Sequence, residues 1–140
     1  GKDIYLKSLI FSYASLFVTI IIGIVYIFNP TANLLLTIGW LLFLGFITFI
    51  INGHLYKIVP FLVWYQRFSP LIGKQKVPML ADMVPIKSSK FQFMFSAIGV
   101  IIGALGILFG SNEIFKVGVS FLFVGSVFML KDLMFMINLK

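Results

Sequence analysis

Residues 8–56 read SLIFSYASLFVTIIIGIVYIFNPTANLLLTIGWLLFLGFITFIINGHLY and contain no Asp, Glu, Lys or Arg. A membrane helix needs about 20 mainly apolar residues to cross a hydrocarbon core of about 30 Å, and this stretch holds enough for two. The turn NPTAN at 29–33 lies between them, and its proline and asparagines can stop one helix and cap the next. The stretch therefore predicts an antiparallel pair of membrane-spanning helices.

The composition of the whole chain is also typical of a membrane protein. Of its 140 residues 61% are hydrophobic, against about half in an ordinary globular domain. Windows long enough to span a membrane occur at 8–28, 34–53, 91–109 and 114–137. We predict an all-α fold: an integral membrane four-helix bundle of two transmembrane hairpins, forming a single domain over 1–140. An ordered cytoplasmic, interfacial loop is expected at 57–90. A chain that begins with Gly1 fits a processed protein or part of a longer one.

The basic residues predict the orientation of this bundle. Only Lys116 falls on the side of the two tight turns, and the others fall on the opposite side: Lys2, Lys7, Lys57, Arg67, Lys74, Lys76, Lys87, Lys90, Lys131 and Lys140. The positive-inside rule then places both termini and the middle loop in the cytoplasm, as in a bacterial-type inner membrane. The net charge of +7 indicates an anionic inner leaflet as a partner, and not a nucleic acid.

The residue types exclude several kinds of catalysis. The chain has no cysteine, which removes thiolate metal sites and cysteine nucleophiles. Its only acids are Asp3, Asp82, Glu113 and Asp132, and their positions predict neither a carboxylate pair nor a Ser/His/Asp set at one depth. We therefore do not expect the chain to be catalytic alone.

Two stripes of small residues predict helix packing faces, since small side chains let membrane helices approach closely. The first predicted helix carries Ser12, Ser15 and Thr19 at three- and four-residue spacing. The third carries Gly99, Gly103, Gly106 and Gly110, which form two GxxxG patterns at 99–103 and 106–110. Packing of these two stripes against each other is one arrangement they allow.

The segment 52–85 mixes apolar anchors with lysine, arginine, tryptophan and tyrosine, a composition typical of a membrane interface. We expect the second helix to kink or end near Pro60, which cannot donate a backbone hydrogen bond. Residues 61–68 would then form a short helix on the inner leaflet.

His54 is the only histidine and lies near the inner end of the second helix. Imidazole there could ligate a haem iron, as the chain's one metal-ligand candidate, or hydrogen-bond a quinone. Lys57 and Arg67 could add contacts to a propionate, a quinone headgroup or a lipid phosphate. The alternative is a histidine in the headgroup region, bonded to lipid or backbone.

Lys131 and Asp132 lie close to the inner end of the fourth helix. Either the two form an intramembrane pair inside the bundle or Lys131 extends to the cytoplasmic headgroups.

The stretch GHLYKIVPFLVWYQRF, continued by GKQKVPMLADM, resembles a segment of bacterial multi-spanning membrane proteins of uncertain function that are related to haem-copper respiratory subunits. The resemblance covers 53–83 only. Proteins of that type have more helices and bind haem through several histidines, whereas His54 is the one ligand this chain offers. A second histidine would have to come from another subunit or another part of the same polypeptide.

We expect a membrane subunit or domain of a respiratory or other redox complex, in which 52–85 contacts a partner, lipid, quinone or haem. The alternative is a purely structural accessory subunit, held to other membrane subunits through its glycine and serine stripes. Small-solute transport ranks third, because it requires charged or polar groups at the bilayer midplane, where the first three helices offer hydroxyls and glycines.

Overall fold

The structure, a computed structural model, describes residues 2–139, apart from the side chains of residues 2, 3, 80 and 81. All regular elements in that range are helical. Four helical runs are long and apolar enough to cross a membrane: Ile4–Phe28, Ala32–Leu71, Ile86–Leu108 and Asn112–Ile137. The predicted all-α, four-helix membrane bundle is thereby confirmed.

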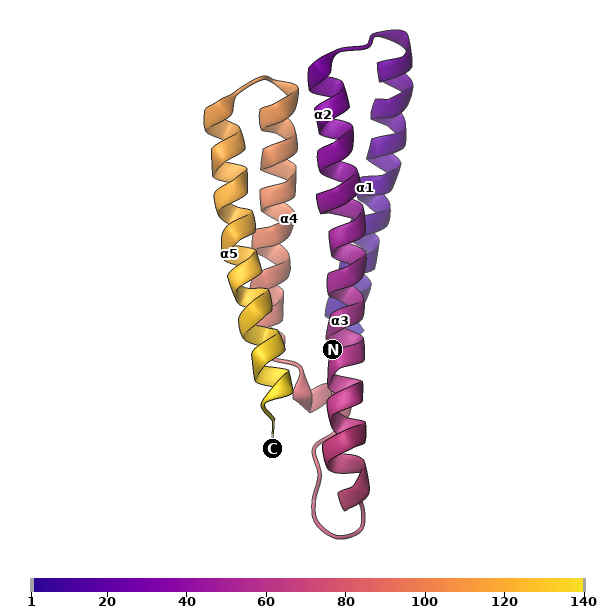
Figure 1. Cartoon of the computed structure of the whole chain (residues 1–140), viewed down its shortest axis with the longest axis vertical. Coiled ribbons are helices and arrows are strands. Elements are labelled where there is room, and N and C mark those ends of the chain that lie inside the picture. Colours follow the sequence, from indigo (N-terminus) through magenta and orange to yellow (C-terminus); the bar gives the residue numbers. More distant parts are fainter. Residues whose placement is uncertain (1, 140) are drawn as a thin grey trace.

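The four runs form two hairpins that lie side by side (Figure 1). The first hairpin consists of α1 (Lys2–Phe28) and a long run that starts with α2 (Ala32–Trp40). The second consists of α4 (Ile86–Leu108) and α5 (Asn112–Ile137). Both hairpin turns lie at one end of the bundle, here called the turn end. The connection between the hairpins lies at the other end, called the basic end because most of the lysines are there.

Local chemistry explains both turns. Thr31 caps α2 by accepting a hydrogen bond from the Leu34 amide at 3.2 Å, and Ser111 caps α5 by accepting one from the Ile114 amide at 3.3 Å. Gly110 has a φ of +68° and ends α4, with the Ser111 amide donating to the Gly106 carbonyl at 2.8 Å. Gly110 therefore shapes the turn between α4 and α5.

The second helical run is longer than predicted. From α2 it continues through the π-helical η1 (Leu41–Ile47), α3 (Thr48–Val63), the π-helical η2 (Trp64–Phe68) and the short η3 (Ser69–Leu71). Pro60 lies buried inside α3 and neither ends it nor separates a helix over 61–68. One missing backbone hydrogen bond does not end a helix whose neighbours hold it in place. Together with the start of α4 at Ile86, this shortens the predicted 57–90 loop to 72–85, which includes η4 (Leu80–Met83).

Two apolar clusters form the core. One lies towards the basic end and joins α1, α3, the connection and α5 through Ile4, Tyr56, Val84, Met129 and Met136. The other joins the long run to α4 through Leu41, Phe49, Ala97, Val100 and Ala104. Both clusters contact both hairpins, so that the hairpins form one bundle.

The small-residue stripe of α1 packs against the long run of its own hairpin. Ser12, Ser15 and Thr19 are buried, and a Cβ placed on Gly45 of η1 would lie 2.6 Å from the Ser15 Oγ. The hydroxyls of Ser12 and Thr19 donate to carbonyls of α1 itself, at 2.8 and 2.7 Å.

The glycine stripe of α4 has other partners. A Cβ on Gly99 would lie 2.7 Å from the Leu122 nitrogen of α5, and one on Gly106 would lie 2.8 Å from the Phe115 Cα. A Cβ on Gly103 would lie 2.7 Å from the Trp40 Cε2. The stripe thus faces α5 and one indole ring of α2, and not the stripe of α1.

Candidate functional site at the basic end

A carboxylate is completely buried where three helices meet. Asp132 of α5 is 0% exposed. One of its oxygens accepts a hydrogen bond from the Tyr56 hydroxyl of α3, and the other accepts one from the Ser88 hydroxyl of α4, each at 2.5 Å. Burying an ionisable group is costly unless its polar atoms are bonded, and here both oxygens have a donor. The three residues are called the Asp132 cluster below.

The sequence around each member explains its position. On α5, Met129, Asp132 and Met136 are all buried and recur at three- and four-residue spacing, so the carboxylate lies on the apolar face of the helix. Tyr56 lies one turn before the buried Pro60 on the same face of α3. Ser88 lies near the start of α4, where the chain returns from the connection. The cluster is a hydrogen-bonded polar contact between the two hairpins.

Lys131 lies outside this cluster. Its side chain is exposed, and its Nζ lies 5.7 Å from the centroid of the Phe128 ring on the same helix. Neighbouring residues on a helix do not face each other. Asp132 therefore lies inside the bundle and Lys131 points outwards, so the two do not form the predicted pair inside the bundle.

His54 faces α1, on a different side of α3 from Tyr56. Its Nδ1 lies 2.8 Å from the Ile50 carbonyl oxygen, which can only accept, so Nδ1 carries a proton. Its Nε2 lies 3.5 Å from the Tyr5 hydroxyl, and the two rings meet edge to face with centroids 5.2 Å apart. The first bond is within normal range and the second is at its limit.

Lys57 shares Tyr5 with His54. The Nζ of Lys57 lies 4.6 Å from the centroid of the Tyr5 ring, within the range of a cation–π contact. Tyr5 thereby joins two predicted site residues, yet sequence reasoning missed it. Its position depends on how α1 packs against α3, and a lone tyrosine near a helix start carries no signal of that packing.

Arg67 lies apart from His54 and Lys57. Its Nη1 donates to the Leu139 carbonyl at 2.5 Å and to the Ile137 carbonyl. Ile137 is the last residue of α5 and Leu139 lies just beyond it, so neither carbonyl has a partner within the helix. The guanidinium thus fixes the end of α5 to η2, and the predicted cofactor contacts are not brought together around one point.

Within residues 2–139, apart from the side chains that are not described, no three His, Cys, Asp or Glu residues gather closely enough to hold a metal ion. Because His54 is the only histidine of the sequence, a bis-histidine haem could take only one of its two imidazoles from it. Comparison of the chain with protein-family models, curated proteins and solved structures finds no match. The resemblance to relatives of haem-copper subunits over 53–83 stays a prediction.

Proposed function

We propose that this chain is a membrane-embedded structural subunit or domain that assembles with other membrane subunits and is not catalytic alone. One observation carries the proposal: the polar side chains best suited to bind a cofactor are used within the fold. Arg67 caps α5, Asp132 joins the hairpins, and His54 bonds to the backbone through Nδ1.

The outer surface of the bundle supports assembly. Only 17% of the apolar window of α1, and the same share of α5, is buried within the chain, against 44% for α4. In a membrane these outer faces contact lipid or other helices, and membrane helices associate through close packing more than through apolar burial. Four phenyl rings stack across the outer side of α4 and α5, with Phe95 and Phe128 nearly parallel at 6° and their centroids 5.8 Å apart. These rings offer a large contact area to a neighbouring helix.

The experiment that tests this proposal compares two sizes. The chain is tagged in its own cells, extracted in mild detergent and sized on a native gel beside the same chain purified alone from another host. We expect the native species to be larger and to contain other membrane polypeptides whose assembly fails when the chain is deleted. Equal sizes, with unchanged assembly of all other membrane polypeptides after deletion, would exclude the proposal.

A redox role for that complex is the second candidate, and the geometry of His54 favours it. The side chain is half-buried, and its Nε2 lies 3.5 Å from the Tyr5 hydroxyl, a long contact that a haem iron or a quinone could displace. The test is a reduced-minus-oxidised absorption spectrum of the gently extracted complex, with His54→Ala and Tyr5→Phe variants. A haem signal that disappears in His54→Ala and persists in Tyr5→Phe supports ligation. An unchanged signal in His54→Ala excludes it.

The basic end suits an anionic leaflet, and we infer that it faces the cytoplasm of a bacterial-type cell. The lysines there with described side chains are exposed: Lys7, Lys57, Lys74, Lys76, Lys87, Lys90 and Lys131. Each such lysine near an anionic surface contributes about 1 kcal/mol. The turn end carries one lysine, Lys116, and one acid, Glu113, so attraction to anionic lipids is concentrated at the basic end.

A further inference from the structure

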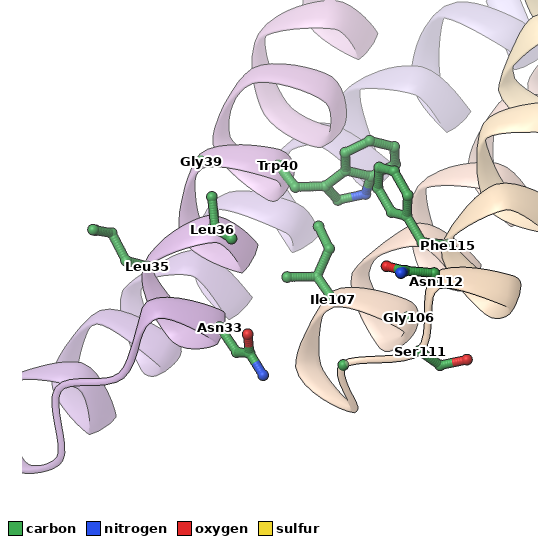
Figure 2. A pocket seen from close by; sticks show the side chains of 11 residues that line it. Asn33, Leu35, Leu36, Gly39, Trp40, Gly106, Ile107, Ser111, Asn112 and Phe115 are labelled. Atoms are coloured by element: carbon green, nitrogen blue, oxygen red, sulfur yellow. The ribbon is translucent and has the colours of Figure 1, made fainter.

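A cavity of about 630 Å³ opens between the two hairpins at the turn end (Figure 2). Its apolar part is lined by the half-buried Trp40, Ile107 and Phe115 and by the exposed Leu36. The polar side chains of Asn33, Ser111 and Asn112 lie towards the hairpin turns. The volume is within the range of about 300–1,000 Å³ that is typical of small-molecule sites.

The apolar wall of the cavity is held in place by the fold. The Trp40 indole donates a hydrogen bond to the Val100 carbonyl at 2.9 Å, and its ring meets Phe115 edge to face with centroids 5.1 Å apart. The indole N–H is therefore occupied, so this part offers apolar contact. Gly39 forms part of the wall, and a Cβ placed there would meet nothing within 4 Å. The cavity thus remains open because this position lacks a side chain.

The surroundings indicate what covers this opening. The cavity lies between the runs Ala32–Leu71 and Asn112–Ile137, both of membrane-spanning length and composition, so its side faces hydrocarbon. Its polar end lies at the turns, where the chain leaves the bilayer. A molecule that fits must be apolar along the bundle and polar at the turn end, which is the layout of a phospholipid.

We propose that this cavity binds one phospholipid from the leaflet at the turn end. One acyl chain lies against Trp40, Leu36 and Phe115. The amide groups of Asn33 and Asn112 donate hydrogen bonds to the ester or phosphate oxygens. The proposal rests on the chain spanning a membrane and not on its assembly with other subunits, so the two can fail separately.

Photo-crosslinking tests the proposal. The full chain is reconstituted in nanodiscs of phosphatidylethanolamine and phosphatidylglycerol that contain a trace of phosphatidylethanolamine with a diazirine on one acyl chain. After illumination, cross-linked peptides are mapped by mass spectrometry. We expect lipid adducts concentrated in the peptides that contain 33–40 and 106–115.

The variant Gly39→Phe adds a phenyl ring at a position that lines the cavity, and its Cβ has no atom within 4 Å. We expect it to reduce the adducts at 33–40 and 106–115 roughly tenfold, a loss of about 1.4 kcal/mol in binding free energy. Gly23→Phe is the matched control, since Gly23 of α1 is also a helical glycine with nothing within 4 Å and does not line the cavity. Its adducts at these peptides should equal those of the native chain.

Three results would overturn the proposal. The first is an equal adduct yield in Gly39→Phe and in the native chain. The second is an equal loss in Gly39→Phe and Gly23→Phe. The third is adducts spread evenly over all outer helix faces, which would indicate bulk lipid only.

Discussion

The hydroxyl of Tyr56 lies 2.5 Å from a carboxylate oxygen of Asp132, although 76 residues separate the two in the chain. Tyr56 belongs to the first hairpin and Asp132 to the second, so this bond crosses the interface between them. Ser88, which bonds the other carboxylate oxygen, belongs to the same hairpin as Asp132. Tyr56 is therefore the member of the Asp132 cluster that joins the hairpins.

Tyr56→Phe should destabilise the bundle by about 1–3 kcal/mol, because it removes one donor from a buried carboxylate and leaves the ring volume unchanged. The measurement is the midpoint of thermal unfolding in detergent micelles. Tyr65→Phe is the control, since Tyr65 is 62% exposed and its hydroxyl can be replaced without leaving a buried group unbonded. Equal midpoints for the two variants would contradict the role given to Tyr56.

Arg67→Gln should loosen the end of α5, because the carbonyls of Ile137 and Leu139 lose their charged donor. A loss of about 1 kcal/mol corresponds to a roughly fivefold larger equilibrium population of the open state. Hydrogen exchange of the peptide that covers 133–139 measures it directly. Lys74→Gln removes a positive charge from an exposed position of the connection and should leave this peptide unchanged. The same acceleration in both variants would mean that overall charge, and not the cap, sets the exchange rate.

Gly118→Ala should separate α4 from α5. A Cβ at this position would lie 2.8 Å from the Gly99 carbonyl oxygen and 2.7 Å from the Gly103 Cα, and these backbone atoms cannot move aside cheaply. We expect a loss of about 1–3 kcal/mol from overpacking. Gly23→Ala, where nothing lies within 4 Å, should instead stabilise its helix by about 0.5–1 kcal/mol. Resistance to unfolding by SDS distinguishes the two, and a stabilising Gly118→Ala would contradict the close contact.

The membrane-spanning core of each helix could be predicted from the sequence, but several helix ends could not. The apolar windows at 8–28 and 91–109 exclude charged residues, so Lys7 and Lys87 lie outside these predicted spans although α1 and α4 include them. A helix continues past lysines whose charges reach water or lipid headgroups. Pro60 predicts a kink or an end of the second helix, because a proline weakens a helix locally. The run continues past it because buried neighbours such as Tyr56 and Phe68 hold it in place.

The Asp132 cluster could not be predicted, because it depends on which helix faces meet. In the sequence, Asp132 is an acid near the end of a span, and Lys131 beside it is its nearest possible partner. The spacing of Met129, Asp132 and Met136 on one helix face was the available signal that the carboxylate points inwards. Nothing in the sequence around Tyr56 or Ser88 indicates that their hydroxyls meet it. Partners that are far apart in the chain require the packed structure.

The cysteine-free chain allows its orientation to be measured with single cysteines. Asn29→Cys places a thiol at an exposed position of the first turn, and Gln75→Cys places one at an exposed position of the connection. The positive-inside rule predicts that a membrane-impermeant maleimide labels Asn29→Cys in intact spheroplasts and labels Gln75→Cys only after permeabilisation. Detergent-solubilised samples of both variants control for thiol reactivity. Labelling of Gln75→Cys alone in intact spheroplasts would invert the orientation, and the basic end would then face the outer leaflet, contrary to the lipid contacts proposed for its lysines.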